Sequence, residues 1–298
     1  MLNPIPSGSK VGIIAPSCAL DSPEDIREGL RWLESSGYRI VLGQYVFEKD
    51  NHLAGTPEQR AEDIMRFFAD PEIKAIIAVC GGYGAQEILP LLKYDVIAKN
   101  PKPIIGFSDT TALQTAIFAQ TGNISYAGIL LKYDFKDNTR IHPYTADSFL
   151  ELMNGKFKEI SGGVRVNGGT AQGKLIGTNL CVLELLAGTP YFPSLKDSIL
   201  LLEDVDEKSY RIERMLTQLS QHPTFSGVRG IIFGQFNDIY LNHPADKDVH
   251  QIIDDFARKH QIPTIKNFPF GHVRARKSVP LGATVILDAD NCSLKLKI

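Results

Sequence analysis

PIIGFSDTTALQTAIF, residues 103–118, predicts a strand, a tight turn and a helix in immediate succession. A serine at such a turn projects its hydroxyl at the positive end of a helix, where developing negative charge is stabilised. Ser108 and Asp109 occupy the turn, and both are also typical helix-capping residues. On these residues alone a cap is the more frequent explanation. The stretch therefore predicts a βα unit and makes Ser108 a candidate nucleophile.

The same alternation of strand and helix signals fills the first half of the chain. Strand-like apolar runs lie at 11–15, 38–42, 75–79 and 104–105, and helical patterns lie at 22–36, from 56 and from 86. Thr56, Pro57 and Gln59 together form the signature of a capped helix start. Repeated βα units predict a parallel, doubly wound sheet.

A polar, glycine-rich stretch interrupts this pattern and predicts a linker at 146–172. It would separate an N-terminal α/β domain, 1–145, from a C-terminal domain, 173–298. In the second part, strands are expected at 198–202 and 230–234, a helix at 209–221, and a hairpin formed by 283–287 and 293–296. The C-terminal domain is therefore predicted to be mixed α+β.

The composition is that of a globular protein, with 43% hydrophobic and 22% charged residues. A net charge of −2 predicts neither a nucleic-acid partner nor binding to an anionic membrane. No apolar run approaches the ~20 residues of a membrane span, and the run at 11–16 lacks the basic segment of a signal peptide. We expect a cytoplasmic protein.

The four cysteines are far apart and lack the spacing of a zinc site or a disulfide framework. We expect no metal site and mostly buried, unreactive thiols. Cys80 adjoins a glycine cluster, Gly81-Gly82-Tyr83-Gly84, which leaves a role at a site open.

That glycine cluster follows the apolar run at 75–79. Glycines there would let backbone N–H groups approach a ligand, as an oxyanion hole or a phosphate cradle requires. An ordinary glycine turn is equally compatible, but a dinucleotide fingerprint is not, because the spacing and the later acidic residue are missing. In open α/β sheets ligands bind beyond the carboxyl ends of the strands. The cluster and Ser108 are therefore expected to meet.

Two further residues complete a possible catalytic set. Glu203 opens the acidic stretch 203–207 directly after the predicted strand 198–202, where a carboxylate would be held rigidly. A solvated acidic loop is the usual explanation for such a stretch. His272 follows an aromatic, proline-containing loop, 268–271, which can fix the orientation that a general base needs. Histidines in loops are more often structural, so a catalytic role for His272 is inferred only from its combination with Ser108 and Glu203.

Several motifs occur in the order found in one known family. They are Ile14-Ala15-Pro16-Ser17, Leu53-Ala54-Gly55-Thr56, Gly81-Gly82-Tyr83-Gly84, Gly106-Phe107-Ser108-Asp109, Gly177-Thr178-Asn179-Leu180, Leu202-Glu203-Asp204-Val205-Asp206-Glu207, Phe270-Gly271-His272 and Pro280-Leu281-Gly282. Over nearly its whole length the chain resembles the LD-carboxypeptidases, also called the peptidase S66 family.

The resemblance implies a catalytic triad with Ser108 as nucleophile, Glu203 as orienting acid and His272 as general base. It places the oxyanion hole and substrate contacts at Gly81, Gly82 and the backbone of Asp109. The implied fold is a flavodoxin-like N-terminal domain with a smaller, swivelling β/α C-terminal domain. The implied activity is release of terminal D-alanine from the murein tetrapeptide at an L,D peptide bond, during cytoplasmic cell-wall recycling. Neither a metal nor an organic cofactor is implied, and a homodimer is.

The chain also departs from the family pattern. Cys80 stands where many relatives carry arginine, and 126–129 lacks an expected Gly-Pro. The loop after His272 is basic, with Arg274, Arg276 and Lys277. An arginine there could bind a substrate carboxylate, although a solvated charge run is the more common explanation.

The sequence bears on three alternatives to a murein peptidase. A microcin-C-type immunity peptidase would hydrolyse an amide between an acidic amino acid and a nucleotide, although such relatives tend to be longer. A non-catalytic peptide-binding protein would be expected to lack a triad residue, and all three are present. An α/β-hydrolase esterase is excluded, because Thr110 stands where its G-x-S-x-G turn needs glycine.

Overall fold

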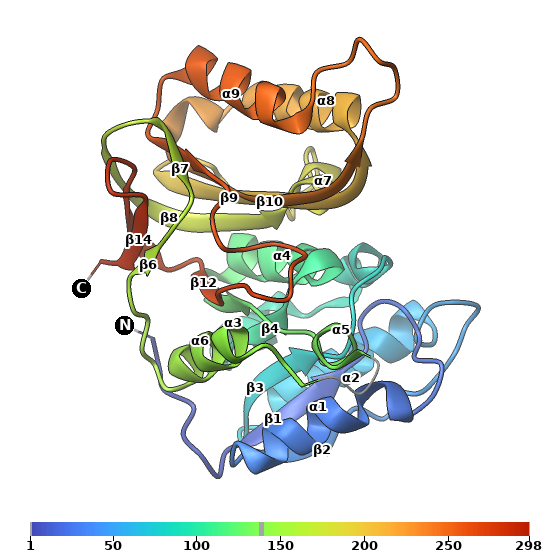
Figure 1. The fold of residues 1–298 in the computed structure, drawn as a ribbon. Coiled ribbons are helices and arrows are strands. Elements are labelled where there is room, and N and C mark those ends of the chain that lie inside the picture. Colours follow the sequence, from blue (N-terminus) through green and yellow to red (C-terminus); the bar gives the residue numbers. More distant parts are fainter. Residues whose placement is uncertain (1, 137–139, 298) are drawn as a thin grey trace.

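The computed structural model describes residues 2–136 and 140–297, which form two sheets with helices around them (Figure 1). Residues 1, 137–139 and 298, which fall within the predicted domain ranges, lie outside the described residues.

The first sheet has the strand order β12-β5-β4-β3-β1-β2. Its strands are β1 (Lys10–Ile14), β2 (Arg39–Leu42), β3 (Ile73–Ala78), β4 (Ile104–Gly106), β5 (Ser125–Ala127) and β12 (Val279–Leu281). The first five pair in parallel in the order 2-1-3-4-5, which is that of flavodoxin-like folds. β12 returns from the C-terminal part of the chain and pairs antiparallel with β5. The predicted flavodoxin-like sheet is confirmed.

Helices cover both faces of this sheet. They are α1 (Glu24–Ser35), α2 (Pro57–Ala69), α3 (Tyr94–Lys99), α4 (Thr111–Thr121), α5 (Leu131–Asp134) and α6 (Pro143–Met153), with a 3-10 helix, η1, at Ala85–Leu91. Ile76 packs in the same buried cluster as α2, and the next residue, Ile77, packs with α1. Neighbouring strand residues thus enter opposite cores, which explains why the run at 75–79 is continuously apolar.

The second sheet is mixed, in the order β6-β14-β13-β8-β9-β10-β11-β7. Its strands are β6 (Ile160–Ser161), β7 (Val164–Asn167), β8 (Thr170–Asn179), β9 (Ser198–Lys208), β10 (Val228–Tyr240), β11 (Thr264–Lys266), β13 (Thr284–Asp288) and β14 (Ser293–Leu296). The associated helices are α7 (Leu180–Leu185), α8 (Ser209–Ser220), α9 (Val249–His260) and a 3-10 turn, η4, at Phe225–Gly227. The mixed α+β character of the second half and its C-terminal hairpin are confirmed.

In two places the structure contains more regular structure than the sequence indicated. The segment 146–172 contains most of α6, all of β6 and β7, and the start of β8. β6 and β7 are the two edge strands of their sheet, where polar and glycine-containing sequence is tolerated. β9 extends beyond the predicted strand 198–202 and includes the acidic stretch 203–207, because it stays paired with β10 as far as Lys208. The domain boundaries themselves stay a prediction.

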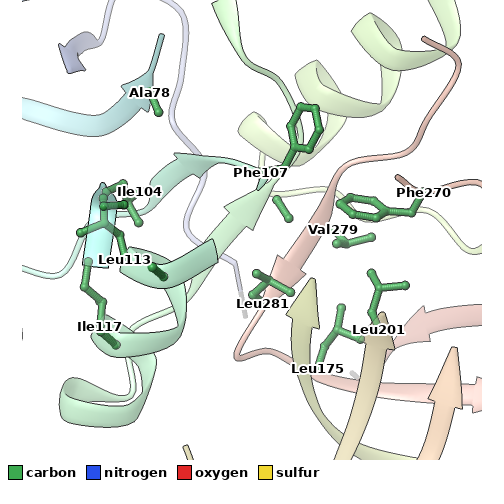
Figure 2. Close-up of a cluster of buried hydrophobic side chains, with 14 of the residues drawn as sticks. Ala78, Ile104, Phe107, Leu113, Ile117, Leu175, Leu201, Phe270, Val279 and Leu281 are labelled. Atoms are coloured by element: carbon green, nitrogen blue, oxygen red, sulfur yellow. The ribbon is translucent and has the colours of Figure 1, made fainter. Parts of the chain in front are cut away.

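The junction between the sheets is apolar. α4 lies between the first sheet and the β8–β10 region of the second (Figure 1). One continuous buried cluster includes Leu113 of α4, Val279 and Leu281 of β12, Leu175 of β8 and Leu201 of β9 (Figure 2). The turn that follows β4 is thereby held near the carboxyl end of β8.

Candidate active site

Ser108 lies directly after β4, in a 3-10 turn, η2 (Ser108–Thr110), that leads into α4. Its φ angle of 61° is in the left-handed region, which residues with a Cβ rarely adopt. Strained backbone of this kind clusters at functional sites, including nucleophile turns. Gly106 is needed two residues earlier, because a Cβ there would lie 2.7 Å from Thr110 Oγ1. The turn holds Ser108 half-buried at the carboxyl edge of the first sheet.

The glycine loop 81–84 packs against this turn. A Cβ on Gly81 would lie 2.9 Å from Ser108 Oγ and 3.4 Å from the Asp109 backbone nitrogen. A Cβ on Gly82, whose φ is 108°, would lie 2.1 Å from Cys18 Sγ. Within the described residues, the Gly82 N–H donates no backbone hydrogen bond. The loop thus brings bare backbone up to the serine hydroxyl, with an N–H available to a ligand oxygen.

The Asp109 side chain anchors the turn. Its carboxylate is buried and accepts hydrogen bonds from Ser17 Oγ at 2.6 Å and from the Ala85 backbone N–H at 2.9 Å. Burial raises the pKa of the Asp109 carboxyl, against the opposing effect of these two hydrogen bonds. Because Ala85 follows the glycine loop, Asp109 ties that loop to the Ser108 turn. Any contribution of Asp109 to the predicted oxyanion hole would therefore come from its backbone N–H.

Glu203 and His272 meet as the sequence predicts. Glu203 lies in β9 and is fully buried, and its Oε2 lies 2.7 Å from His272 Nδ1. A carboxylate at Nδ1 assigns the ring proton to that nitrogen and leaves Nε2 as an acceptor. The second oxygen, Oε1, accepts from Asn179 Nδ2 at 3.3 Å. Both oxygens of this buried carboxylate therefore have donors, as burial of a charge requires.

The loop carrying His272 is fixed from two sides. Its Phe270 carbonyl accepts from the Gln235 backbone N–H at 2.7 Å. The Phe107 ring, next to Ser108, packs edge-on against the His272 ring with centroids 5.0 Å apart. These contacts connect the histidine to both β10 and the Ser108 turn.

The basic loop is not a solvated charge run at Arg276. This side chain is fully buried, and its guanidinium pairs with Asp134 at 2.6 Å and lies 4.1 Å from the centre of the Phe107 ring. It also donates to the carbonyls of Gly128 and Val273. The guanidinium of Arg276 is therefore hydrogen-bonded to groups inside the protein. Arg274, in contrast, is exposed.

Ser108 and His272 line one cavity of about 290 Å³, together with Gly81, Gly82, Lys132 and Tyr133. Among the described residues Ser108 Oγ has no hydrogen-bond partner, and the His272 ring is hydrogen-bonded to Glu203. In structures without substrate, hydrogen bonds between candidate catalytic groups are often long or poorly aligned. A larger cavity, about 510 Å³, lies at the opposite ends of the strands beside residues 2–6 and contains none of the predicted site residues.

Cys80 also lines the smaller cavity. Its thiol donates to the Cys18 carbonyl at 2.9 Å. Burial raises the pKa of the Cys80 thiol to about 12, so it is protonated at neutral pH. Cys80 therefore contributes shape to the cavity and no anionic nucleophile.

Lys132, Tyr133 and Asn179 were missed from the sequence. The rule that ligands bind beyond strand carboxyl ends could have indicated the first two, because they follow β5. Asn179 lies in the motif Gly177-Thr178-Asn179-Leu180, to which the sequence assigned no chemical role. Within residues 2–136 and 140–297 no group of three or more His, Cys, Asp or Glu side chains could hold a metal ion. No helix in the same residues is long and apolar enough to span a bilayer.

Comparison with known proteins gives matches along both halves of the chain. Residues 11–128 match the LD-carboxypeptidase N-terminal domain, and residues 172–287 match the LD-carboxypeptidase C-terminal domain. The chain is 32% identical to the probable murein peptide carboxypeptidase of Bacillus subtilis (strain 168) over 286 residues, 94% of this chain and 89% of that protein.

Two solved structures are similar over almost the whole chain. The muramoyltetrapeptide carboxypeptidase of Oxalobacter formigenes superimposes with a TM-score of 0.87 at 27% identity, covering 96% of this chain and 97% of that one. The microcin C7 self-immunity protein MccF, in complex with aspartyl sulfamoyl adenosine, gives a TM-score of 0.90 at 25% identity, covering 99% and 97%.

Proposed function

The chain belongs to the LD-carboxypeptidase family, and we propose that it is a serine carboxypeptidase that releases the terminal D-alanine of a murein tetrapeptide. The observation that carries the proposal is the 2.7 Å hydrogen bond between Glu203 Oε2 and His272 Nδ1, with His272 and Ser108 lining one cavity. A histidine oriented in this way can act as the base that a serine nucleophile needs.

In the proposed reaction, Ser108 Oγ attacks the carbonyl carbon of the L,D peptide bond while His272 Nε2 takes the hydroxyl proton. Glu203 keeps the ring in the tautomer that accepts this proton and stabilises the imidazolium that forms. The same proton then passes to the leaving D-alanine nitrogen. Water, activated by His272, hydrolyses the acyl-enzyme and restores Ser108.

The backbone of Gly82 and Asp109 supplies the proposed oxyanion hole. The Asp109 nitrogen lies at the start of the helical turn behind Ser108, and the Gly82 N–H has no backbone acceptor of its own among the described residues. Each donor aimed at the developing oxyanion is worth about 10²–10³ in rate. Asp109 adds rigidity, because its carboxylate ties the two donor segments together.

Lys132 suits the free carboxylate that a carboxypeptidase substrate must carry. Its amino group pairs with Asp25 at 2.8 Å and with Asp21 at 3.1 Å, and the residue lines the cavity. An ammonium group has three N–H donors, so these two pairs leave one for a substrate. Although burial lowers the pKa of Lys132, the hydrogen bonds to the two aspartates leave it raised, so the group is charged.

A second candidate is an immunity-type peptidase that hydrolyses aminoacyl-nucleotide amides. It is favoured by the similarity to MccF, whose structure contains aspartyl sulfamoyl adenosine. The two candidates share the same serine chemistry and differ in the group that leaves. We also propose, from the family resemblance, that the protein acts in the cytoplasm as a homodimer and needs no cofactor.

The test presents both substrates to the wild-type protein and follows the products by mass spectrometry. Release of one alanine from L-Ala-γ-D-Glu-meso-diaminopimelate-D-Ala, with aspartyl sulfamoyl adenosine left intact, is the expected result. Release of aspartate from the nucleotide, with the tetrapeptide intact, would replace the proposed function by the second candidate.

A further inference from the structure

Asn179 joins the end of β8 to the buried carboxylate of Glu203. The two residues lie opposite each other where β8 and β9 pair in parallel. Asn179 Nδ2 donates to Glu203 Oε1 at 3.3 Å and to Asp204 Oδ1 at 3.1 Å, while its Oδ1 caps α7 by accepting from the Val182 N–H at 3.0 Å. The amide therefore holds the oxygen of Glu203 that His272 does not contact.

Asn179 is in turn connected to the helix behind the nucleophile. Its backbone N–H donates to Thr111 Oγ1 at 3.4 Å, and Thr111 Oγ1 lies 3.2 Å from Thr178 Oγ1. Thr111 and Thr178 are fully buried, and Asn179 is 5% exposed. Thr111 is the first residue of α4 and follows Ser108 by three positions. A chain of hydrogen bonds thus runs from α4 through Asn179 and Glu203 to His272.

The need for such a connection follows from the fold. Ser108 is carried by the first sheet, and Glu203 is carried by the second. Between the sheets lie mainly apolar side chains, such as Leu113, Leu175 and Leu281 (Figure 2). Apolar contacts are non-directional, whereas hydrogen bonds fix distance and angle. A misplacement of about 1 Å between catalytic groups can cost about 10²-fold in rate.

We propose that Thr111 and Asn179 are positioning residues that hold Glu203, and through it His272, in register with Ser108. The proposal rests on the proposed serine mechanism and goes beyond it, because neither residue touches the substrate in that mechanism. A purely structural role would also satisfy these buried groups, but it would affect stability and leave the reactivity of Ser108 unchanged.

The test uses two replacements of Thr111 that separate its hydroxyl from its methyl group. Thr111→Val keeps the shape and removes the hydroxyl, whereas Thr111→Ser keeps the hydroxyl. We would measure the rate of covalent labelling of Ser108 by a small fluorophosphonate, together with kcat and KM on the tetrapeptide. For Thr111→Val we expect labelling and kcat to fall about tenfold or more, with KM within about twofold. Thr111→Ser should stay within about threefold of the wild type.

Asn179→Ser provides an independent variant. Serine can still cap α7, but its short side chain cannot reach Glu203. We expect a loss in labelling rate similar to that of Thr111→Val, and a double variant that is less impaired than the product of the two effects, because both changes break one chain. If Thr111→Val does not fold, this variant alone carries the test.

The outcomes separate this inference from the proposed function. If the wild type is labelled at Ser108 and both Thr111→Val and Asn179→Ser are labelled at the same rate, the positioning role is overturned. If the wild type itself is not labelled, it is the serine mechanism that fails. Equal losses for Thr111→Val and Thr111→Ser would also overturn the role of the hydroxyl.

Discussion

Ser108 is shaped by the glycines around it. Gly106 admits the Thr110 side chain behind the turn, and Gly81 leaves room for the serine hydroxyl in front. Gly82 adopts a φ of 108° directly over the Cys18 sulfur. Each of these glycines is present because a single methyl group would enter occupied space. Their effects on activity and stability should therefore be separable.

Gly81→Ala should remove activity while leaving the fold intact. Its backbone does not have positive φ, but the new Cβ would lie 2.8 Å from Ser108 Cβ, so Ser108 must move. We expect a loss of about 10²-fold or more in kcat/KM, with a melting temperature close to that of the wild type. Gly82→Ala, in contrast, should lower the melting temperature as well. Equal melting temperatures for the two variants would contradict this reading of the loop.

Lys132→Met should weaken binding of the substrate carboxylate. Loss of a charge-assisted hydrogen bond predicts a KM for the tetrapeptide raised about tenfold, with kcat within about twofold. The matched control is the tetrapeptide with a C-terminal amide, for which wild type and variant should have the same KM. A KM for the free acid that does not change would exclude Lys132 as the carboxylate contact.

Among the elements, the loop between β11 and β12 shows how one buried pair can organise a site. Arg276 reaches from this loop to Asp134 at the end of α5, and on the way it packs on the ring of Phe107. Phe107 also packs against His272. The ion pair therefore fixes the neighbours of the proposed base rather than the substrate.

Arg276→Met should destabilise the protein strongly. It leaves the Asp134 carboxylate buried without its cation, which typically costs about 3–5 kcal/mol. Arg274→Met is the matched control, because Arg274 is exposed on the same loop and its loss should change stability by about 0.5 kcal/mol or less. Urea unfolding measures both. Similar urea midpoints for the two variants would show that the buried ion pair contributes no more to stability than the exposed arginine does.

The sequence indicated where this loop lies, but not what its charges do. His272 stood out by its aromatic and glycine neighbours, and these local features survive in the structure. The partner of Arg276, in contrast, is more than a hundred positions away, and no local pattern identifies it. The same holds for β9, which extends beyond the predicted strand 198–202 because it pairs with β10 as far as Lys208.

In the whole molecule, burial of carboxyl groups should make stability depend on pH. Desolvation, followed by the charge of Glu203, raises the pKa of Asp204 from 3.8 to about 7. Burial also raises the pKa values of Asp63 and Asp109. The folded protein then binds these protons more tightly than the unfolded chain.

The free energy of unfolding should therefore fall as pH rises from about 4 to about 7, because the raised pKa favours the folded state only while Asp204 is protonated. The size of the effect is on the order of a few kcal/mol. Urea unfolding between pH 4.5 and 8 measures it, and Asp204→Asn should flatten the dependence. A variant with the same slope as the wild type would assign the effect to other groups.

At this scale the sequence was most informative. Alternating βα signals predicted the parallel, doubly wound sheet, and the family resemblance predicted its flavodoxin-like form and the convergence of Ser108, Gly81 and His272. Neither signal could predict that β12 crosses back to the first sheet or that 146–172 supplies both edge strands of the second, because these pairings join distant segments. The hydrogen bonds that connect Thr111 to Glu203 through Asn179 could not be predicted for the same reason.

In the proposed function, Ser108 attacks the terminal L,D peptide bond of a murein tetrapeptide. The most direct test is mass spectrometry of L-Ala-γ-D-Glu-meso-diaminopimelate-D-Ala after incubation with the wild type and with Ser108→Ala. Loss of one alanine with the wild type, and no loss with Ser108→Ala over the same period, is the predicted result. Equal release of alanine by both proteins would contradict the account, because the bond would then be cleaved without the serine hydroxyl.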